Sequence, residues 1–200
     1  MVEANINPSA NPSSQFFEPN ERMFCIIGNI TYDKLRNLTV KKVATHEDGR
    51  YILDADGNKT YTQVKVFKET EAGDINEART DMEDVKIGVM TCFGAKEHEI
   101  TMIENADQSK LNKTFYAIMA KVYENNEQGK KTFIFLYYAG HGEMDLFTYA
   151  MLNADTDDKY RFALEQQLRT LGRIEGAYVI AVFDCCRSHV HPALRRGNAG

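Results

Sequence analysis

The sequence predicts an α/β fold in which helices flank a mainly parallel sheet. Runs such as 132–139 and 178–183 are short, rich in β-branched and aromatic residues, and bounded by polar residues, which is typical of buried parallel strands. Between such runs, other segments carry apolar residues at steps of three and four, which is typical of amphipathic helices. The alternation of the two patterns predicts a parallel sheet with helices on both faces.

Composition and charge limit what the chain can be. Its 200 residues suit one domain with a real core, and its net charge of −5 argues against a general nucleic-acid binder. Apolar runs are too short for a membrane span, and the N-terminus lacks the layout of a signal peptide. Four cysteines, two of them adjacent, make a poor disulfide framework. We therefore expect an intracellular, cytoplasmic protein with reduced thiols.

The first third of the chain contains one core strand and a long polar segment. Residues 1–20 are rich in Asn, Pro and Ser, which predicts a disordered lead, and 23–29 predicts the first strand. The polar segment 32–73 is interpreted as an insertion. Within it, 50–53 and 60–67 flank an Asp-Gly pair, which predicts a β-hairpin.

Helices and strands then alternate. Residues 74–93 predict a helix, with Asp74 as N-cap and Glu77 completing a capping box. A strand is predicted over 99–104, and Asp107 is expected to cap the next helix. A last helix is predicted over 161–171, just before the strand at 178–183.

Reactive residues follow two of the predicted strands at the point where each strand ends. His141 lies between two glycines directly after 132–139, and Cys185 and Cys186 follow Asp184 after 178–183. Ligands of open α/β sheets bind at the carboxyl ends of the strands. A histidine beside a thiol at this edge is a candidate cysteine–histidine dyad, in which the thiolate attacks and the imidazole moves the proton.

The motifs Tyr-Tyr-Ala-Gly-His-Gly, ending at Gly142, and Asp-Cys-Cys-Arg-Ser, ending at Ser188, resemble those of caspase-like cysteine proteases. They are closer to the metacaspase and paracaspase branch than to animal caspases, in which the histidine lies about 50 residues before the cysteine. The resemblance covers 23–188 apart from the insertion. It implies a three-layer caspase-like sandwich and a cysteine endopeptidase acting on proteins or peptides. Residues 21–200 would then be the large-subunit part of the catalytic domain.

The resemblance also implies roles for particular residues. Cys186 holds the third place of the Asp-x-Cys motif and is the expected nucleophile. Cys185 is the alternative, and since successive strand residues point to opposite faces, only one of the two thiols should face His141. The backbone N–H groups of Gly142 and Cys186 are expected to form the oxyanion hole.

The expected specificity follows from charge. Asp184 stands where animal caspases carry Gln, and in metacaspases this carboxylate is associated with the pocket for the residue before the cut. We therefore expect cleavage after Arg or Lys. Asp84 and Asp155 are further candidates for that pocket. Arg79 favours the opposite preference, for Asp, because an arginine in this region serves that specificity in caspases.

The chemistry itself requires no cofactor. Many metacaspases need calcium as an activator, and Asp155, Asp157 and Asp158 supply the hard oxygen ligands that calcium prefers. The competing interpretation is an acidic surface loop.

Zinc is a further alternative for the region around the two adjacent cysteines. Cys185, Cys186, His189 and His191 are zinc ligand types, but their spacing is not that of a usual zinc finger.

Caspase-like domains normally continue past the catalytic cysteine with two more strands. We therefore expect a C-terminal region resembling the small subunit, or a second chain, to complete the sheet. The pair Arg195 and Arg196 lies where family members are often cut, which predicts self-cleavage, the alternative being a basic tail. The alternative function is a catalytically inactive interaction module that pairs through its exposed edge strand.

Overall fold

Four parallel strands form the central sheet of the computed structural model, which describes residues 19–67, 73–144, 148–153, 159–185 and 188–189. The strand order is β4 (Ile100–Glu104), β1 (Glu21–Gly28), β5 (Thr132–Ala139) and β9 (Ala177–Asp184). All three pairings are parallel. The prediction of an α/β fold with a parallel central sheet is confirmed.

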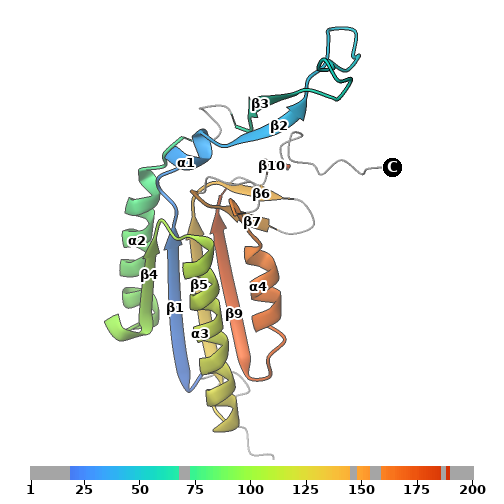
Figure 1. Cartoon of the computed structure of the whole chain (residues 1–200). Coiled ribbons are helices and arrows are strands. Elements are labelled where there is room, and N and C mark those ends of the chain that lie inside the picture. The colour runs from blue at the N-terminus through green and yellow to red at the C-terminus, as the bar shows by residue number, and fades with distance from the viewer. Residues whose placement is uncertain (1–18, 68–72, 145–147, 154–158, 186–187, 190–200) are drawn as a thin grey trace, which may run out of the picture.

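Helices cover both faces of this sheet (Figure 1). Phe24 and Ile26 of β1 pack in the cluster that contains residues of α2 (Glu77–Phe93). Cys25 and Ile27 point the other way, into the cluster built by α3 (Gln108–Glu127) and α4 (Leu164–Leu171). Strands buried on both faces read as continuous apolar runs, which is why their sequences show no alternation.

The helix boundaries correct two predictions. Asp107 caps α3 as expected, its carboxylate accepting the Lys110 N–H at 2.7 Å. Asp74 does not cap α2, because that helix begins three residues later with Asn76 at the N-cap. The last helix begins at Leu164 rather than at residue 161, because Arg161 and Phe162 form a short strand instead.

A second, smaller sheet continues from the carboxyl end of β5. Its order is β10 (Ser188–His189), β6 (Gly142–Met144), β7 (Thr148–Met151) and β8 (Arg161–Phe162). The pairing of β10 with β6 is parallel. The chain that leaves β9 therefore runs beside the chain that leaves β5, immediately after His141.

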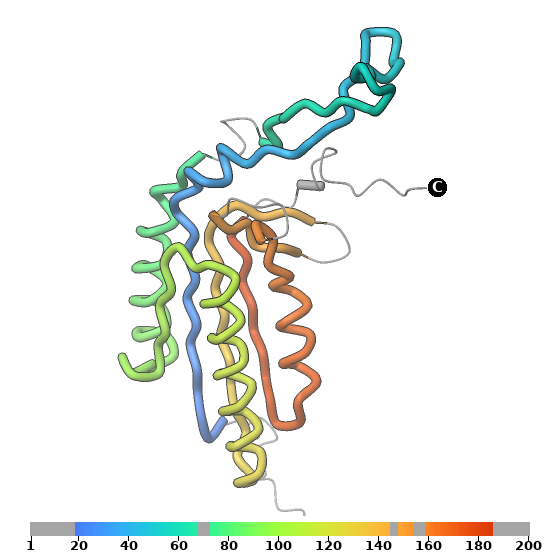
Figure 2. The backbone as a smooth tube through the Cα atoms, viewed as in Figure 1, coloured from blue at the N-terminus to red at the C-terminus, as the bar shows by residue number. Residues whose placement is uncertain are grey.

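A hairpin arm leads away from this body. A short helix, α1 (Asp33–Arg36), precedes β2 (Thr39–Val43), which pairs antiparallel with β3 (Tyr61–Lys65). Figures 1 and 2 show the arm running out from the sheet and returning. A hairpin was expected in this insertion, but its main ladder joins β3 to β2, and 50–53 contributes only isolated bridges.

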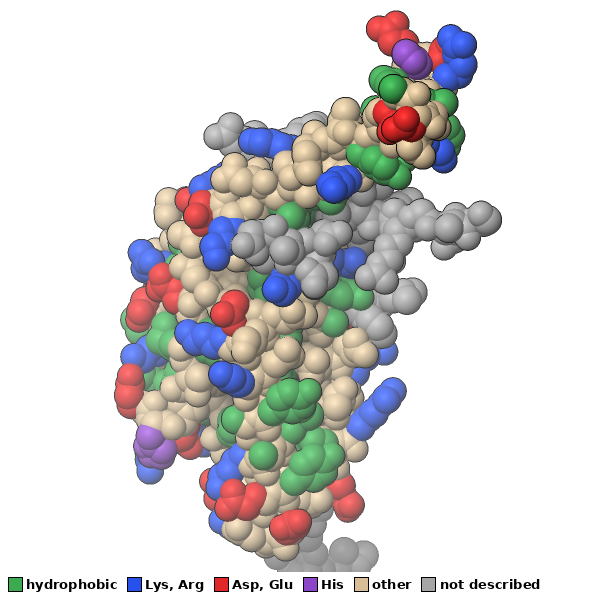
Figure 3. Space-filling view, in the orientation of Figure 1, with side chains coloured by type: hydrophobic (Ala, Val, Ile, Leu, Met, Phe, Trp, Pro, Cys, Tyr) green, Lys and Arg blue, Asp and Glu red, His purple; other side chains and the backbone are tan. Residues whose placement is uncertain are grey.

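The far end of the arm is open to solvent. Acidic and basic side chains mix there (Figure 3), and Tyr51, Leu53 and Tyr61 are exposed. The remaining described element is a short 3-10 helix, Glu97–Glu99, that leads into β4. Within the described part of the chain, no helix is both long enough and apolar enough to cross a bilayer.

Candidate active site

His141 lies at the carboxyl edge of the central sheet, beside the end of the neighbouring strand. Ala139 of β5 is in register with Asp184 of β9, and the Gly140 N–H donates to the Asp184 carbonyl at 3.2 Å. The histidine and the segment that carries Cys185 and Cys186 therefore follow adjacent strand ends. Cys186 itself lies outside the described residues.

Gly140 makes the turn into His141 sterically feasible. Its φ of +147° is a conformation that other L residues rarely adopt. A Cβ at this position would lie 2.7 Å from the Tyr32 hydroxyl and 2.8 Å from the Tyr138 hydroxyl. Because both hydroxyls hold the His141 backbone, the glycine allows them to approach it.

Two tyrosine hydroxyls fix the His141 peptide groups. The His141 N–H donates to Tyr32 Oη at 2.9 Å, and Tyr138 Oη donates to the His141 carbonyl at 2.7 Å. The Tyr32 hydroxyl in turn donates to the Asn29 carbonyl at 2.9 Å. The Tyr32 ring also lies against the imidazole, with ring centroids 4.6 Å apart. Both the backbone and the ring of His141 are thus held in place.

The imidazole makes one further contact that assigns its proton. Nε2 lies 2.8 Å from the Gly73 carbonyl oxygen. A carbonyl oxygen only accepts, so Nε2 must carry the hydrogen. In the neutral ring, Nδ1 is then the nitrogen with an available lone pair. The geometry therefore leaves Nδ1 as the atom able to take a proton.

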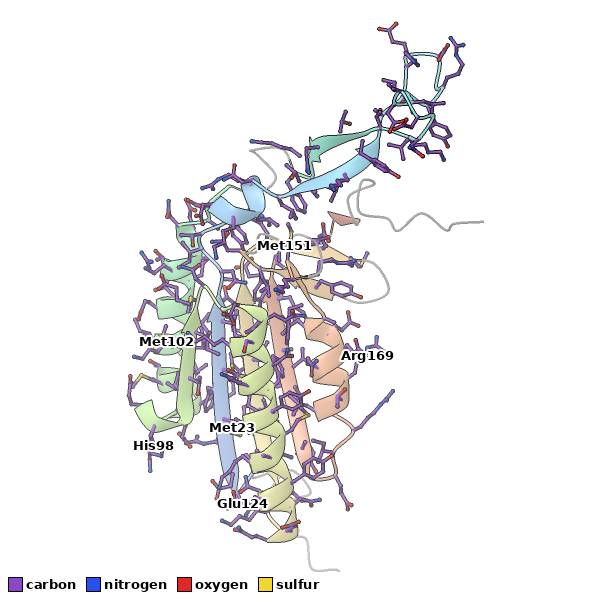
Figure 4. The ribbon with its side chains drawn as sticks, viewed as in Figure 1. Met23, His98, Met102, Glu124, Met151 and Arg169 are labelled. Atoms are coloured by element: carbon purple, nitrogen blue, oxygen red, sulfur yellow. The ribbon has the colours of Figure 1, made fainter. Side chains whose placement is uncertain are left out.

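Asn29 ties this region to the rest of the sheet. It is only 1% exposed, yet it carries an amide that can make several hydrogen bonds. Its Nδ2 donates to the carbonyl of Met151, labelled in Figure 4, at 3.0 Å, and its Oδ1 accepts the Ala106 N–H at 3.1 Å. The end of β1 is thereby joined to β7 and to the segment before α3.

The two tyrosines remain protonated hydrogen-bond donors. Burial raises the pKa of Tyr32 and of Tyr138 above the ordinary value, and Cys185 lies close enough to both hydroxyls to add to the rise. Cys185 is half-buried and packs with Phe183 and Ala181 against the α3 and α4 side of the sheet. Cys185 is therefore the thiol that the described residues place near the hydroxyls holding His141, and Cys186 lies outside those residues.

The expected specificity carboxylate lies at the same edge. Asp184 is exposed at the end of β9 and accepts a hydrogen bond from Tyr137 Oη at 3.1 Å. Burial, and then the neighbouring Asp184 and Asp81, raise the pKa of Tyr137, which keeps its hydroxyl a donor. Asp84 lies on the exposed side of α2. Asp81, a half-buried residue of the same helix, lies close enough to the Tyr137 hydroxyl to act on its pKa.

Asp81 could have been found in the sequence. It lies three residues after Ala78 and one before Met82, two buried residues of α2, so helical spacing places it beside the apolar stripe. No such signal marks Tyr32, Asn29 or Gly73, whose contacts with the site join distant parts of the chain.

The other predicted residues divide into two groups. Arg79, the feature that favours Asp specificity, forms an ion pair with Glu104. Asp155, Asp157, Asp158, Arg195, Arg196 and His191 lie outside the described residues, as does most of the predicted N-terminal lead, and the side chain of His189 is not described. Among the residues that are described, no group of three or more His, Cys, Asp or Glu side chains is placed to hold a metal ion.

Comparison with models of known protein families finds no match to this chain, and comparison with curated proteins finds none either.

Proposed function

We propose that this protein is a cysteine endopeptidase of the metacaspase type, with a caspase-like three-layer domain, that cuts after Arg or Lys. One observation carries the proposal. His141 is held by its backbone and by Nε2 at the end of β5, and the neighbouring strand β9 ends just before Cys185 and Cys186 in the sequence. An oriented imidazole beside a thiol is the arrangement that nucleophilic catalysis requires.

In the proposed reaction, His141 acts through Nδ1. It takes the proton of the Cys186 thiol, the thiolate attacks the scissile carbonyl, and the imidazolium returns the proton to the leaving amine. Water then hydrolyses the acyl-enzyme. The resemblance assigns the backbone N–H groups of Gly142 and Cys186 to the oxyanion, a role worth about 3 kcal/mol per donor in other enzymes.

Charge supports the proposed preference for a basic residue. The Asp184 carboxylate is exposed at the end of β9, the strand next to the one that leads to His141, and Asp81 adds negative charge near Tyr137. A carboxylate forms charge-assisted hydrogen bonds with the guanidinium of an arginine substrate. Arg79, which would favour an acidic substrate, is paired with Glu104 instead. Calcium, bound by Asp155, Asp157 and Asp158, is proposed as an activator and not as a participant in the chemistry.

Paired fluorogenic peptides, one ending in Arg and one in Asp, test this function. We expect the Arg peptide to be cut and the Asp peptide to be refused, with activity lost in Cys186→Ala and retained in Cys185→Ala. Each assay is run with and without added calcium. Cleavage of the Asp peptide alone, or loss of activity in Cys185→Ala alone, would contradict the assignment.

A second function, an inactive module that binds through the sheet edge, is favoured by one observation. Tyr178, Ile180 and Val182 of β9 are 42%, 49% and 43% exposed, and β9 is the edge of the four-stranded sheet. A folded protein that cuts neither peptide, with or without calcium, would favour this function.

A further inference from the structure

Asp74 has a structural role that the proposed chemistry does not use. Its sequence position suggested a helix cap, but its Oδ1 accepts the Tyr32 N–H at 2.8 Å and lies 2.8 Å from Nη1 of Arg36. Both partners lie at the base of the hairpin arm, far from Asp74 in the sequence. The carboxylate therefore joins the start of α2 to the segment that carries Tyr32.

The residue before Asp74 holds the imidazole. Gly73 and Asp74 share one peptide group, so the Gly73 carbonyl lies in the same plane as the Asp74 N–H. A glycine gives that carbonyl wide conformational freedom unless its neighbours restrain it. The hydrogen bonds of the Asp74 side chain supply such a restraint next to the carbonyl that accepts from His141 Nε2.

Asp74 also acts on the second contact of the ring. Its carboxylate accepts the backbone N–H of Tyr32. The ring of Tyr32 lies against the imidazole, and the Tyr32 hydroxyl accepts the His141 N–H. Two of the groups that surround His141 are thus fixed through one carboxylate.

We propose that Asp74, with Arg36, is a positioning residue that holds the Gly73 carbonyl against Nε2 and thereby keeps the His141 proton on Nε2. The assignment of the proton stands on geometry alone. Its consequence, that Nδ1 stays available as the base, rests on the proposed function.

The exposure of the Arg36–Asp74 ion pair indicates that it contributes more to positioning the Gly73 carbonyl than to the stability of the fold. The Arg36 and Asp74 side chains are 26% and 38% exposed. Ion pairs at such exposure typically contribute little to the free energy of folding. Removing the pair should therefore leave the fold intact, while small displacements at a reacting group can cost about a hundredfold in rate.

Nuclear magnetic resonance of the full chain with 15N-labelled histidine tests the proposal. Ring protons of exposed histidines exchange too fast to be observed, whereas an Nε2–H held in a hydrogen bond to a half-buried carbonyl gives a resolved signal. The chain has five histidines, and His141→Asn identifies the signal of interest. We expect the wild type to show this signal and Asp74→Ala to lose it.

Matched variants separate positioning from general destabilisation. Asp74→Asn keeps an acceptor oxygen and should retain the signal. Glu97→Ala breaks a comparable surface pair on α2, with Lys86 at 2.7 Å, and should retain it fully. If Asp74→Ala fails to fold, Arg36→Gln is measured in its place, and we expect the His141 Nε2–H signal to be weaker than in the wild type. A wild type without the signal, or an unchanged signal in a folded Asp74→Ala or Arg36→Gln, would overturn the proposal.

Kinetics add a second measurement. On the Arg peptide, Asp74→Ala should lower kcat by about tenfold while KM changes little, because the substrate pocket is untouched. An equal loss confined to KM would overturn the positioning role. If the wild type cuts no peptide but its ring signal still depends on Asp74, the proposed function fails and the positioning role stands.

Discussion

The carboxylate of Asp184 combines exposure with a fixed orientation. Tyr137 Oη holds Oδ2 at 3.1 Å, and this tyrosine is buried within the α2 side of the sheet. A carboxylate has about four lone-pair sites, so the hydroxyl leaves most of them for a cationic ligand. Tyr137 therefore orients the Asp184 carboxylate by donating a hydrogen bond to it, and the Tyr137 hydroxyl stays protonated.

The charge of Asp184 should determine the substrate preference. Asp184→Asn keeps the shape and the Tyr137 contact but removes the charge. A hydrogen bond to a charged group is worth about 1.5–3 kcal/mol, so kcat/KM for the Arg peptide should fall by about tenfold or more, mainly through KM. Steady-state kinetics with the paired Arg and Asp peptides measure the effect.

Glu83→Gln is the matched control for that variant. Glu83 is an exposed acid on α2, so its loss should leave the Arg peptide kinetics unchanged within about twofold. A wild-type KM in Asp184→Asn would place the specificity elsewhere, with Asp81 as the next carboxylate to replace.

Single residues differ in how far their sequence position reveals their role. His141 follows a strand and lies between glycines, so its place at the sheet edge was predictable. Its partners were not, because Tyr32 is 109 positions away and Gly73 is 68 positions away along the chain. Asp74 was predicted to cap α2, which is wrong, because its carboxylate instead accepts hydrogen bonds from Tyr32 and Arg36, which are distant in the sequence.

At the scale of an element, β9 differs from the two inner strands of the central sheet, β1 and β5. Its residues alternate between half-buried and exposed, whereas β1 and β5 are buried for most of their length. A groove of about 660 Å³, lined in part by Leu168, Tyr178 and Ile180, lies along it. An edge strand that exposes apolar side chains is a template for association.

A charge on β9 should reduce association without weakening the fold. Ile180 is 49% exposed, so Ile180→Lys removes little packing and introduces a repulsive charge at the edge. We expect less concentration-dependent association than in the wild type, with a melting temperature changed by no more than about 3 °C. Light scattering and thermal melting measure the two quantities.

Ile87→Lys makes the same chemical change at an exposed site on α2, where no strand edge is present. It should associate as the wild type does. Equal behaviour of the two variants would mean that general hydrophobicity, and not the β9 edge, drives association.

Elements with a strong period or a buried apolar run were predicted within a few residues, whereas the two-residue strands β8 and β10 were not. The strand β10 is only two residues long and is defined by its pairing with β6. Arg161 and Phe162 were assigned to the last helix, because a pair of residues carries no period of its own. Their place is decided by their pairing with the neighbouring strand β7.

The whole molecule divides into a packed body and an arm. All three core clusters draw on residues of the body or of the arm's base, and none contains a residue from 45–60. The parallel architecture of the body followed from the sequence because alternating buried runs and amphipathic stripes permit few topologies. The direction of the arm could not be predicted, because few packed side chains fix an exposed hairpin.

Because residues 44–60 at the far end of the arm lie outside the three core clusters, they should be removable without loss of the fold. Val43 pairs with Tyr61, so replacing residues 44–60 by Asn-Gly closes the ladder with a two-residue turn. The backbone hydrogen bonds of Ala44, Ile52 and Thr60 join these three residues to one another, so none is orphaned in the body. We expect a melting temperature within about 3 °C of the wild type and the same His141 ring signal, because Arg36, Tyr32 and Asp74 all lie outside the deleted segment.

A large loss of stability would show that the arm is part of the fold. Lost peptide cleavage in a stable protein would instead assign the arm to substrate binding.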